Sequence, residues 1–150
     1  MVSIMGRLQI TGAHNISVNT DILIEDIKEE ADMLVLPGGM PGTNYLREHE
    51  GLAELLKKQY KAGKWVAAIC AAPSVLGELG FLKDKKATSY PGCLEGILVG
   101  EYSEEAVVVD DNVITSRGVG TAIAFALSLI EVLAGKEKSE EVAASIIYSA

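Results

Sequence analysis

The sequence is poor in the features that mark secreted and membrane proteins. Its 150 residues include only two cysteines, too few for the disulfide framework of a small secreted domain. No apolar run reaches the roughly 18 residues that a membrane-spanning helix requires. The first residues also lack the basic segment and long apolar stretch of a signal peptide. We therefore predict a cytoplasmic protein with no membrane partner.

Basic residues are also scarce, which argues against a nucleic-acid partner. Lys and Arg number 13 against 21 Asp and Glu, for a formal net charge of −8. Such a chain repels phosphate backbones, and it has no basic stripe to offset the repulsion.

Its two histidines and two cysteines show no metal-ligand spacing, and its glycines at 38–42 lack the Lys-Ser/Thr of a phosphate-binding loop. We expect neither a metal nor another cofactor.

Short β-like runs alternate with longer helical runs along the whole chain. No repeat or linker interrupts them, so we expect a single domain. The patterns predict strands at Val2–Met5, Leu8–Thr11, Asn15–Val18, Met33–Leu36, Trp65–Ile69, Val107–Val109 and Val113–Ser116. They predict helices from Thr43 or Asn44 to Ala62, from Pro73 to Gly80, at Gly118–Ala134, and from a cap at Ser139 onward. This alternation predicts an α/β protein with a parallel sheet covered by helices on both faces.

Three of the predicted strands run directly into unusual residues. One leads into Pro37-Gly38-Gly39, one into Cys70, and one into Thr115-Ser116-Arg117-Gly118. In parallel sheets, binding sites lie beyond the carboxyl ends of the strands. We therefore expect these three strand ends to meet at one site.

Cys70 lies between a predicted strand and a predicted helix, with Ala68 and Ala72 two positions to either side. This pattern resembles a nucleophile elbow, in which small residues permit a tight strand-to-helix turn. The positive end of the following helix favours a thiolate at such a position. The N–H of Ala71 and a second N–H from Gly38 are candidates to stabilise an oxyanion. The alternative is that Cys70 is a small buried apolar residue, as most free cysteines are.

The segments Leu36-Pro37-Gly38-Gly39, Ala68–Pro73 and Thr115–Thr121 occur together and in order. As a set they resemble the ThiJ/PfpI superfamily, on the branch of the parkinsonism-associated protein deglycase and its bacterial relatives. The resemblance runs over residues 1–150 and implies a flavodoxin-like three-layer sandwich, usually a homodimer. It implies that Cys70 is the nucleophile and that Gly38 and Ala71 form the oxyanion hole. Protease-like members carry His directly after the cysteine, so Ala71 argues against a peptidase.

The resemblance also implies a segment that these residues do not contain. The family normally begins with one further strand and helix, ending just before the position of Val2. That unit supplies an acidic residue that hydrogen-bonds the cysteine, and no residue here matches it. We therefore expect residues 1–150 to form a ThiJ/PfpI-like domain that lacks the family's first β–α unit and one central strand of its sheet.

Three further residues are candidates for substrate binding or for the dimer interface: His14 on an early predicted hairpin, Gly39 beside the oxyanion glycine, and Arg117 after a strand end. Arg117 suits an anionic substrate, a dimer contact or a structural salt bridge. His49 is expected on a charged helix face, as a surface residue. Cys93 either has no role at the site or resolves an oxidised Cys70 by forming a disulfide with it.

The resemblance favours a cofactor-free enzyme in which Cys70 attacks small reactive carbonyls such as methylglyoxal, as a glyoxalase- or deglycase-type hydrolase or lyase. The alternative is a redox-sensing or chaperone-like stress protein in which Cys70 is oxidised without turnover. Both readings need a reactive Cys70, so the sequence leaves both open. Nothing in these residues supports the thiazole-biosynthesis role once attached to this branch.

Overall fold

A four-stranded sheet organises the computed structural model, which describes residues 1–149. In spatial order its strands are β5 (Met33–Leu36), β6 (Trp65–Ile69), β10 (Val113–Ser116) and β9 (Val107–Asp110). The first three run parallel, and β9 is antiparallel to β10. The mainly parallel sheet predicted from the apolar strand runs is confirmed.

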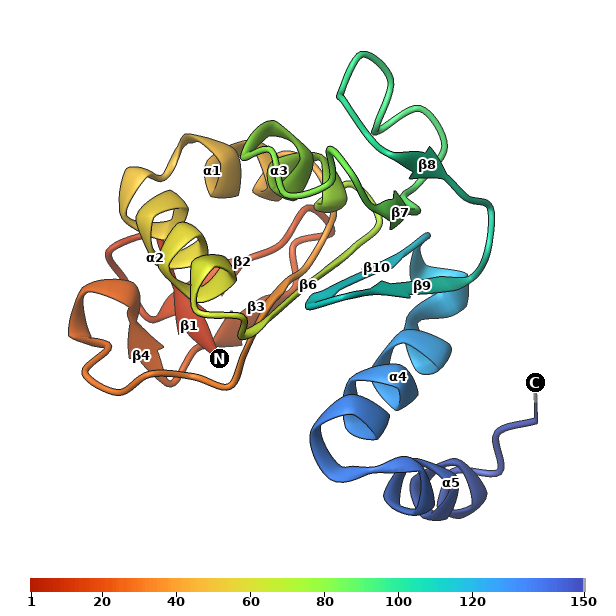
Figure 1. The fold of residues 1–150 in the computed structure, drawn as a ribbon. Coiled ribbons are helices and arrows are strands. Elements are labelled where there is room, and N and C mark those ends of the chain that lie inside the picture. The colour runs from red at the N-terminus through yellow and green to blue at the C-terminus, as the bar shows by residue number, and fades with distance from the viewer. Residues whose placement is uncertain (150) are drawn as a thin grey trace.

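Helices cover both faces of this sheet (Figure 1). On one face, α2 (Glu50–Lys61) and α3 (Pro73–Glu78) bury Leu56 and Leu76 against Val66 of β6. On the other face, Phe125 of α4 (Ala122–Ala134) packs on Ala67 and Ile114. Successive strand residues point to opposite faces, which is why apolar runs without alternation mark these strands. The three-layer α/β sandwich is therefore confirmed.

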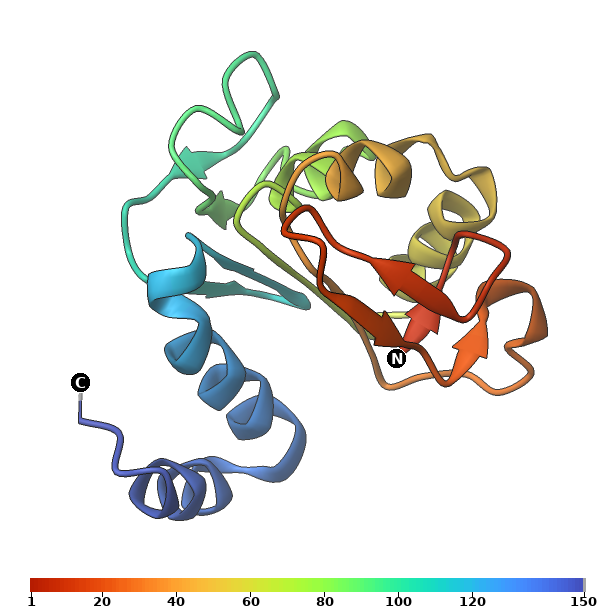
Figure 2. The same ribbon diagram turned by 180° about the vertical axis from the view of Figure 1, so that it is seen from behind.

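Shorter elements surround the sheet. β1 (Val2–Ser3) pairs in parallel with β4 (Ile22–Leu23), and β7 (Lys86–Ala87) with β8 (Glu101–Tyr102). β2 (Gln9–Thr11) and β3 (Ser17–Asn19) form an antiparallel hairpin, which Figure 2 shows on the side turned away in Figure 1. The remaining helical segments are α1 (Gly42–Glu48), α5 (Lys136–Ser145) and the 3-10 turns η1 (Ile24–Asp26) and η2 (Val119–Thr121).

The helix predicted to run unbroken to Ala62 is in fact two helices. It divides at His49, whose Nδ1 accepts a hydrogen bond from the N–H of Leu52 at 3.0 Å. Such a side-chain acceptor satisfies one of the free N–H groups at a helix start. The prediction of His49 as a plain surface residue is therefore wrong, because it caps α2.

The starts of the last two helices also differ from the prediction. α4 begins at Ala122 because the residues just after Gly118 form η2. α5 begins at Lys136, directly after Gly135 ends α4, so Ser139 lies inside the helix. Ser139 is buried, and its hydroxyl donates to the carbonyl of Leu127 at 2.9 Å. It fastens α5 to α4 instead of capping a helix.

β5 was predicted to be covered on both faces, and this is wrong. The side chain of Val35 is 45% exposed although it lies in the middle of the strand. The reason is that α4 packs on β9 and β10, at the opposite edge of the sheet from β5.

Candidate active site

Cys70 occupies a strained turn at the end of β6. Its φ is 66°, in the left-handed region that costs a non-glycine residue roughly 1–2 kcal/mol. Hydrogen bonds from both sides hold it there: its N–H donates to the carbonyl of Ser116 at 3.0 Å, and its carbonyl accepts from the N–H of Tyr90 at 2.9 Å. The thiol is half-buried and unpaired by any disulfide. The strand, turn and helix expected around Cys70 are all present.

Gly38 lies directly against this turn. A Cβ atom built on Gly38 would be 2.6 Å from Cβ of Cys70 and 2.6 Å from the carbonyl oxygen of Ile69. It would also be 3.1 Å from the backbone nitrogen of Ala71. The parallel pairing of β5 with β6 brings these strand ends together. The structure thus gathers Gly38, Cys70 and the backbone nitrogen of Ala71 at one point.

The third strand end, after β10, has a structural role at this site. Ser116 is fully buried, and its hydroxyl bonds the carbonyl of Ala106 and the hydroxyl of Thr121, both at 2.7 Å. Arg117 donates to the carbonyl of Glu104 at 3.1 Å, so it bonds a main-chain oxygen. Among residues 1–149 it does not form the structural salt bridge that was one of its expected roles. The three strand ends do meet, as predicted, but the hydroxyl of Ser116 is already engaged.

Sequence reasoning missed the turn formed by Tyr90-Pro91-Gly92-Cys93. The N–H of Cys93 donates to the carbonyl of Tyr90 at 3.0 Å, and Gly92 has a φ of 83°. Proline followed by a left-handed glycine is typical of a type II turn. The Tyr90 ring extends toward Gly118, where an added Cβ would lie 3.6 Å from its Cδ2. The Pro-Gly pair signals the turn, but nothing local signals that it lies beside Cys70.

Cys93 is the second thiol at this site, and its surroundings raise its pKa. Burial is the largest cause, and the negative charge of the Cys70 thiolate adds to it, while the Arg47 guanidinium opposes both. Arg47 is held by Nε to Glu78 at 2.8 Å and by Nη2 to the hydroxyl of Ser74 at 3.0 Å. At neutral pH Cys93 is therefore a protonated thiol next to a fixed cation.

The structure does not bring His14 and Gly39 to the cysteine through any hydrogen bond among residues 1–149. His14 is exposed in the turn between β2 and β3. Gly39 has a φ of 90°, and its carbonyl accepts from both the N–H and the hydroxyl of Thr43 at 2.9 Å. Gly39 thereby shapes the entry to α1. A substrate or interface role for His14 and Gly39 stays a prediction.

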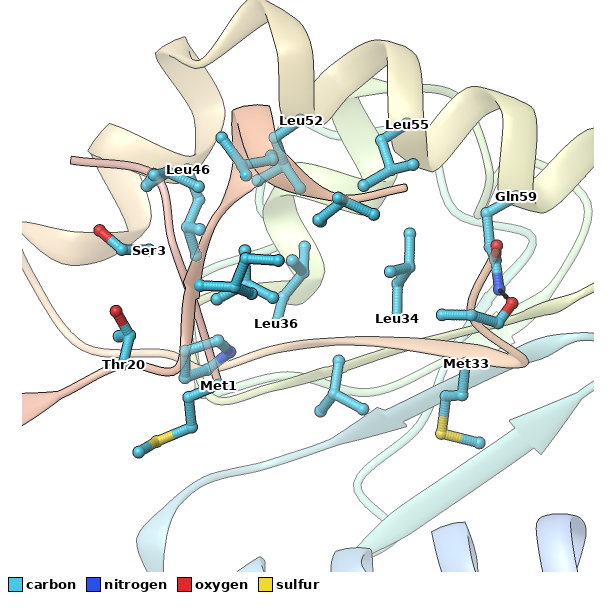
Figure 3. Close-up of a pocket in the computed structure, with 18 of the residues that line it drawn as sticks. Met1, Ser3, Thr20, Met33, Leu34, Leu36, Leu46, Leu52, Leu55 and Gln59 are labelled. Carbon is cyan, nitrogen blue, oxygen red and sulfur yellow. Dashed lines mark hydrogen bonds between the residues drawn. The ribbon is translucent and has the colours of Figure 1, made fainter. Parts of the chain in front are cut away.

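A large apolar cavity borders the site. It has a volume of about 1360 Å³ and lies between β1, β5 and α2 (Figure 3). Gly38 is at its margin, whereas Cys70 is not among its lining residues. Every residue of β1 and of β5 lines it, so both strands turn an edge toward it. Within residues 1–149, β1 pairs only with β4 and β5 only with β6, so these two edges carry unpaired backbone groups.

Two kinds of feature are absent from the described part of the chain. No group of three His, Cys, Asp or Glu side chains is placed to hold a metal ion. No helix between residues 1 and 149 combines the length and apolarity needed to cross a membrane.

Comparison with known proteins places these motifs in a family. The sequence profile of the DJ-1/PfpI family matches residues 1–132. Protein DJ-1 homolog A of Arabidopsis thaliana is 39% identical over 151 residues, covering 98% of this chain and 38% of that protein. The glutathione-independent glyoxalase DJR-1.2 of Caenorhabditis elegans is 39% identical over 122 residues, covering 79% of this chain and 64% of that protein. The chain thus spans less than two thirds of either relative.

A solved structure shares nearly the whole fold. The oxidized form of Toxoplasma gondii DJ-1 superposes with a TM-score of 0.94 at 36% sequence identity. The match covers 99% of this chain and 82% of that one.

Proposed function

The chain belongs to the DJ-1/PfpI family, and on that premise we propose that it is a cysteine-dependent enzyme of the glyoxalase or deglycase type. Its substrates are small reactive carbonyls such as methylglyoxal. The observation that carries the proposal is the packing of Gly38 against the strained turn of Cys70. Similarity to a glutathione-independent glyoxalase supports the same reaction class.

In the proposed reaction the Cys70 thiolate adds to the carbonyl carbon of the substrate. A C–S bond forms, the carbonyl π bond breaks, and the oxygen takes the negative charge of a hemithioacetal anion. The N–H groups of Gly38 and Ala71 are the proposed donors to this oxygen. They are main-chain groups on rigid strand ends, so they need no reorganisation as the charge develops.

A proton must then move to and from this intermediate, and we propose that an acidic residue upstream of residue 1 moves it. The cavity between β1 and β5 supports this view because it is bounded by the free edges of two strands, each of which pairs in parallel with a neighbour on its other edge. One further parallel strand in that space would pair with both edges and satisfy their backbone groups. A unit that supplies the strand would carry its acidic side chain to the sheet end that holds Cys70.

The alternative is a stress protein in which Cys70 is oxidised and does not turn over substrate. The half-buried thiol on a strained turn favours it as much as it favours catalysis, and a relative of similar structure is described in an oxidized form. Either role needs a reduced thiol at the start, so we propose a reducing compartment, the cytoplasm.

Methylglyoxal consumption separates the two roles. The assay compares residues 1–150 with the same chain extended by the first strand and helix of Toxoplasma gondii DJ-1. We expect the extension to raise the rate by about 10²–10⁴, the usual value of acid–base assistance, and Cys70→Ser to abolish it. Cys93→Ser is the matched control and should retain turnover. Equal rates with and without the extension would refute the upstream carboxyl, and no turnover by either chain would favour the stress protein.

A further inference from the structure

The two cysteines of this chain are tied together through the backbone. The N–H of Tyr90 donates to the carbonyl of Cys70 at 2.9 Å, and the N–H of Cys93 donates to the carbonyl of Tyr90 at 3.0 Å. A turn of this kind keeps its first and fourth Cα atoms within about 7 Å. Two hydrogen bonds therefore hold Cys93 close to Cys70, although α3 and β7 lie between them in the sequence.

We propose that Cys93 is the resolving cysteine of Cys70, so that a hydroperoxide converts the pair into an intramolecular disulfide. The inference rests on the proposed nucleophilic character of Cys70. It adds Cys93 to the site and disulfide formation as a second reaction of the Cys70 sulfur. Both thiols are half-buried and free, which leaves them open to a small oxidant.

The chemistry takes two steps and transfers two electrons from the thiols to the peroxide. First the Cys70 thiolate attacks one peroxide oxygen; an S–O bond forms, the O–O bond breaks, and hydroxide or alkoxide leaves. The Cys93 thiolate then attacks the Cys70 sulfur; an S–S bond forms and the S–O bond breaks. The hydroxide that leaves Cys70 takes up the proton of Cys93, and the hydroxide or alkoxide of the first step takes up the proton that Cys70 lost on ionising. The products are a disulfide, one water, and a second water or an alcohol.

The electrostatics of the pair favour this order of events. The charge of the Cys70 thiolate is one cause of the raised pKa of Cys93. Conversion of Cys70 to a neutral sulfenic acid removes that charge, while Arg47 stays in place on Glu78 and Ser74. Oxidation of Cys70 therefore favours ionisation of Cys93 at the moment when its thiolate is required.

The turn lies on a segment that no helix or strand holds in place. Disulfides join residues whose Cα atoms lie about 4.4–6.8 Å apart. Residues 88–100 form turns and irregular backbone between β7 and β8, with no helix or strand. Cys93 therefore sits on a segment that can approach Cys70 without unpairing the central sheet.

The test treats the reduced 150-residue chain with limiting hydrogen peroxide and follows its intact mass and a non-reducing digest. We expect loss of two hydrogens, a cross-linked peptide pair containing Cys70 and Cys93, and a yield independent of protein concentration. In Cys93→Ser the same peroxide should instead add two oxygens to Cys70. Circular dichroism shows whether that variant folds, and Cys93→Ala replaces it if it does not.

The proposal and the proposed function fail in different ways. If Cys70 gains oxygens at the same rate in the parent chain and in Cys93→Ser, with Cys93 left reduced, the resolving role is overturned while a reactive Cys70 stands. A disulfide that forms only between molecules overturns it too. If peroxide leaves Cys70 unmodified, both the resolving role and the nucleophile are overturned.

Discussion

The backbone of Gly38 packs against Cys70 so closely that a methyl group on Gly38 would lie 2.6 Å from the Cys70 Cβ. Real Cβ contacts are longer, so a side chain at position 38 would push the turn of Cys70 away from β5. The close packing of the ends of β5 and β6 therefore requires a glycine at position 38.

Gly38→Ala is accordingly expected to destabilise the fold by about 1–3 kcal/mol, the usual cost of overpacking. It should also change the rate at which iodoacetamide alkylates Cys70. Gly42→Ala is the matched control, because an added Cβ there meets no atom within 4 Å and Gly42 has an ordinary helical position. Urea denaturation measures both variants, and an unchanged midpoint for Gly38→Ala would contradict the packing.

Cys70→Gly should be more stable than Cys70→Ala, by about 0.5–1 kcal/mol. Glycine removes the strain of the left-handed φ, which stabilises Cys70→Gly by roughly 1–2 kcal/mol. The greater conformational freedom of glycine in the unfolded chain offsets about 0.4–1 kcal/mol of this gain. Ala72 provides the control, since its φ of −66° is ordinary. Ala72→Gly should destabilise in the same denaturation assay. If Cys70→Gly is the less stable of the two Cys70 variants, the turn stores no strain.

The Glu30 carboxylate forms ion pairs with Lys58 at 2.8 Å and Lys64 at 3.1 Å. The hydrogen bond from Lys58, then that from Lys64, and the charges of both lower the pKa of Glu30 from 4.5 to about 2. A lowered folded-state pKa stabilises the fold above pH 4.5, and this contribution is lost as the pH falls toward 2.

Glu30→Gln should therefore lower the denaturation midpoint at pH 6 and have progressively less effect between pH 4.5 and pH 2. Because the pair is exposed, the difference should be small and should shrink in high salt. Glu29→Gln removes an equal charge at the neighbouring exposed position and is the matched control, because no ion pair within residues 1–149 includes Glu29. A constant difference across this pH range would rule out the ion pairs as its cause.

The β2–β3 hairpin leaves apolar side chains in solvent, and we expect it to form a homodimer interface. Leu8 is 46% exposed and Ile16 is 69% exposed. A hairpin of two strands is only marginally stable alone, so a partner that covers these residues would stabilise it. Light scattering should give a dimer for the chain extended upstream and a monomer for its Ile16→Glu variant. Leu98→Glu, at a similarly exposed apolar site outside the hairpin, should stay dimeric.

The central strands, the strand-to-helix turn at Cys70 and the family were predictable because each depends on a local sequence pattern. Apolar runs that end in Pro37-Gly38 or at Cys70 mark parallel strands, although the position of α4 leaves Val35 of β5 exposed. The resemblance read from three ordered motifs is confirmed by the family match over residues 1–132. The meeting of the strand ends then follows from parallel pairing alone.

Other features depend on contacts that no local pattern contains. The break at His49 needs an imidazole acceptor at a helix start, which is rarer than the usual Ser, Thr, Asp or Asn caps. Ser139-Glu140-Glu141 resembles a cap, yet Ser139 is held inside a helix by its bond to Leu127. The approach of Cys93 to Cys70 depends on the bond from Tyr90, across a segment without hydrophobic periodicity.

The two open strand edges beside the cavity also bear on how purified copies of this chain behave. The edge of β5 and the edge of β1 are different surfaces, so one molecule's β5 could pair with the next molecule's β1 in a head-to-tail contact. Such a contact does not close on itself, because each added copy leaves one free edge at either end. We therefore expect this 150-residue chain to polymerise into filaments in concentrated solution, and we expect a strand that fills the cavity to remove both growing ends together.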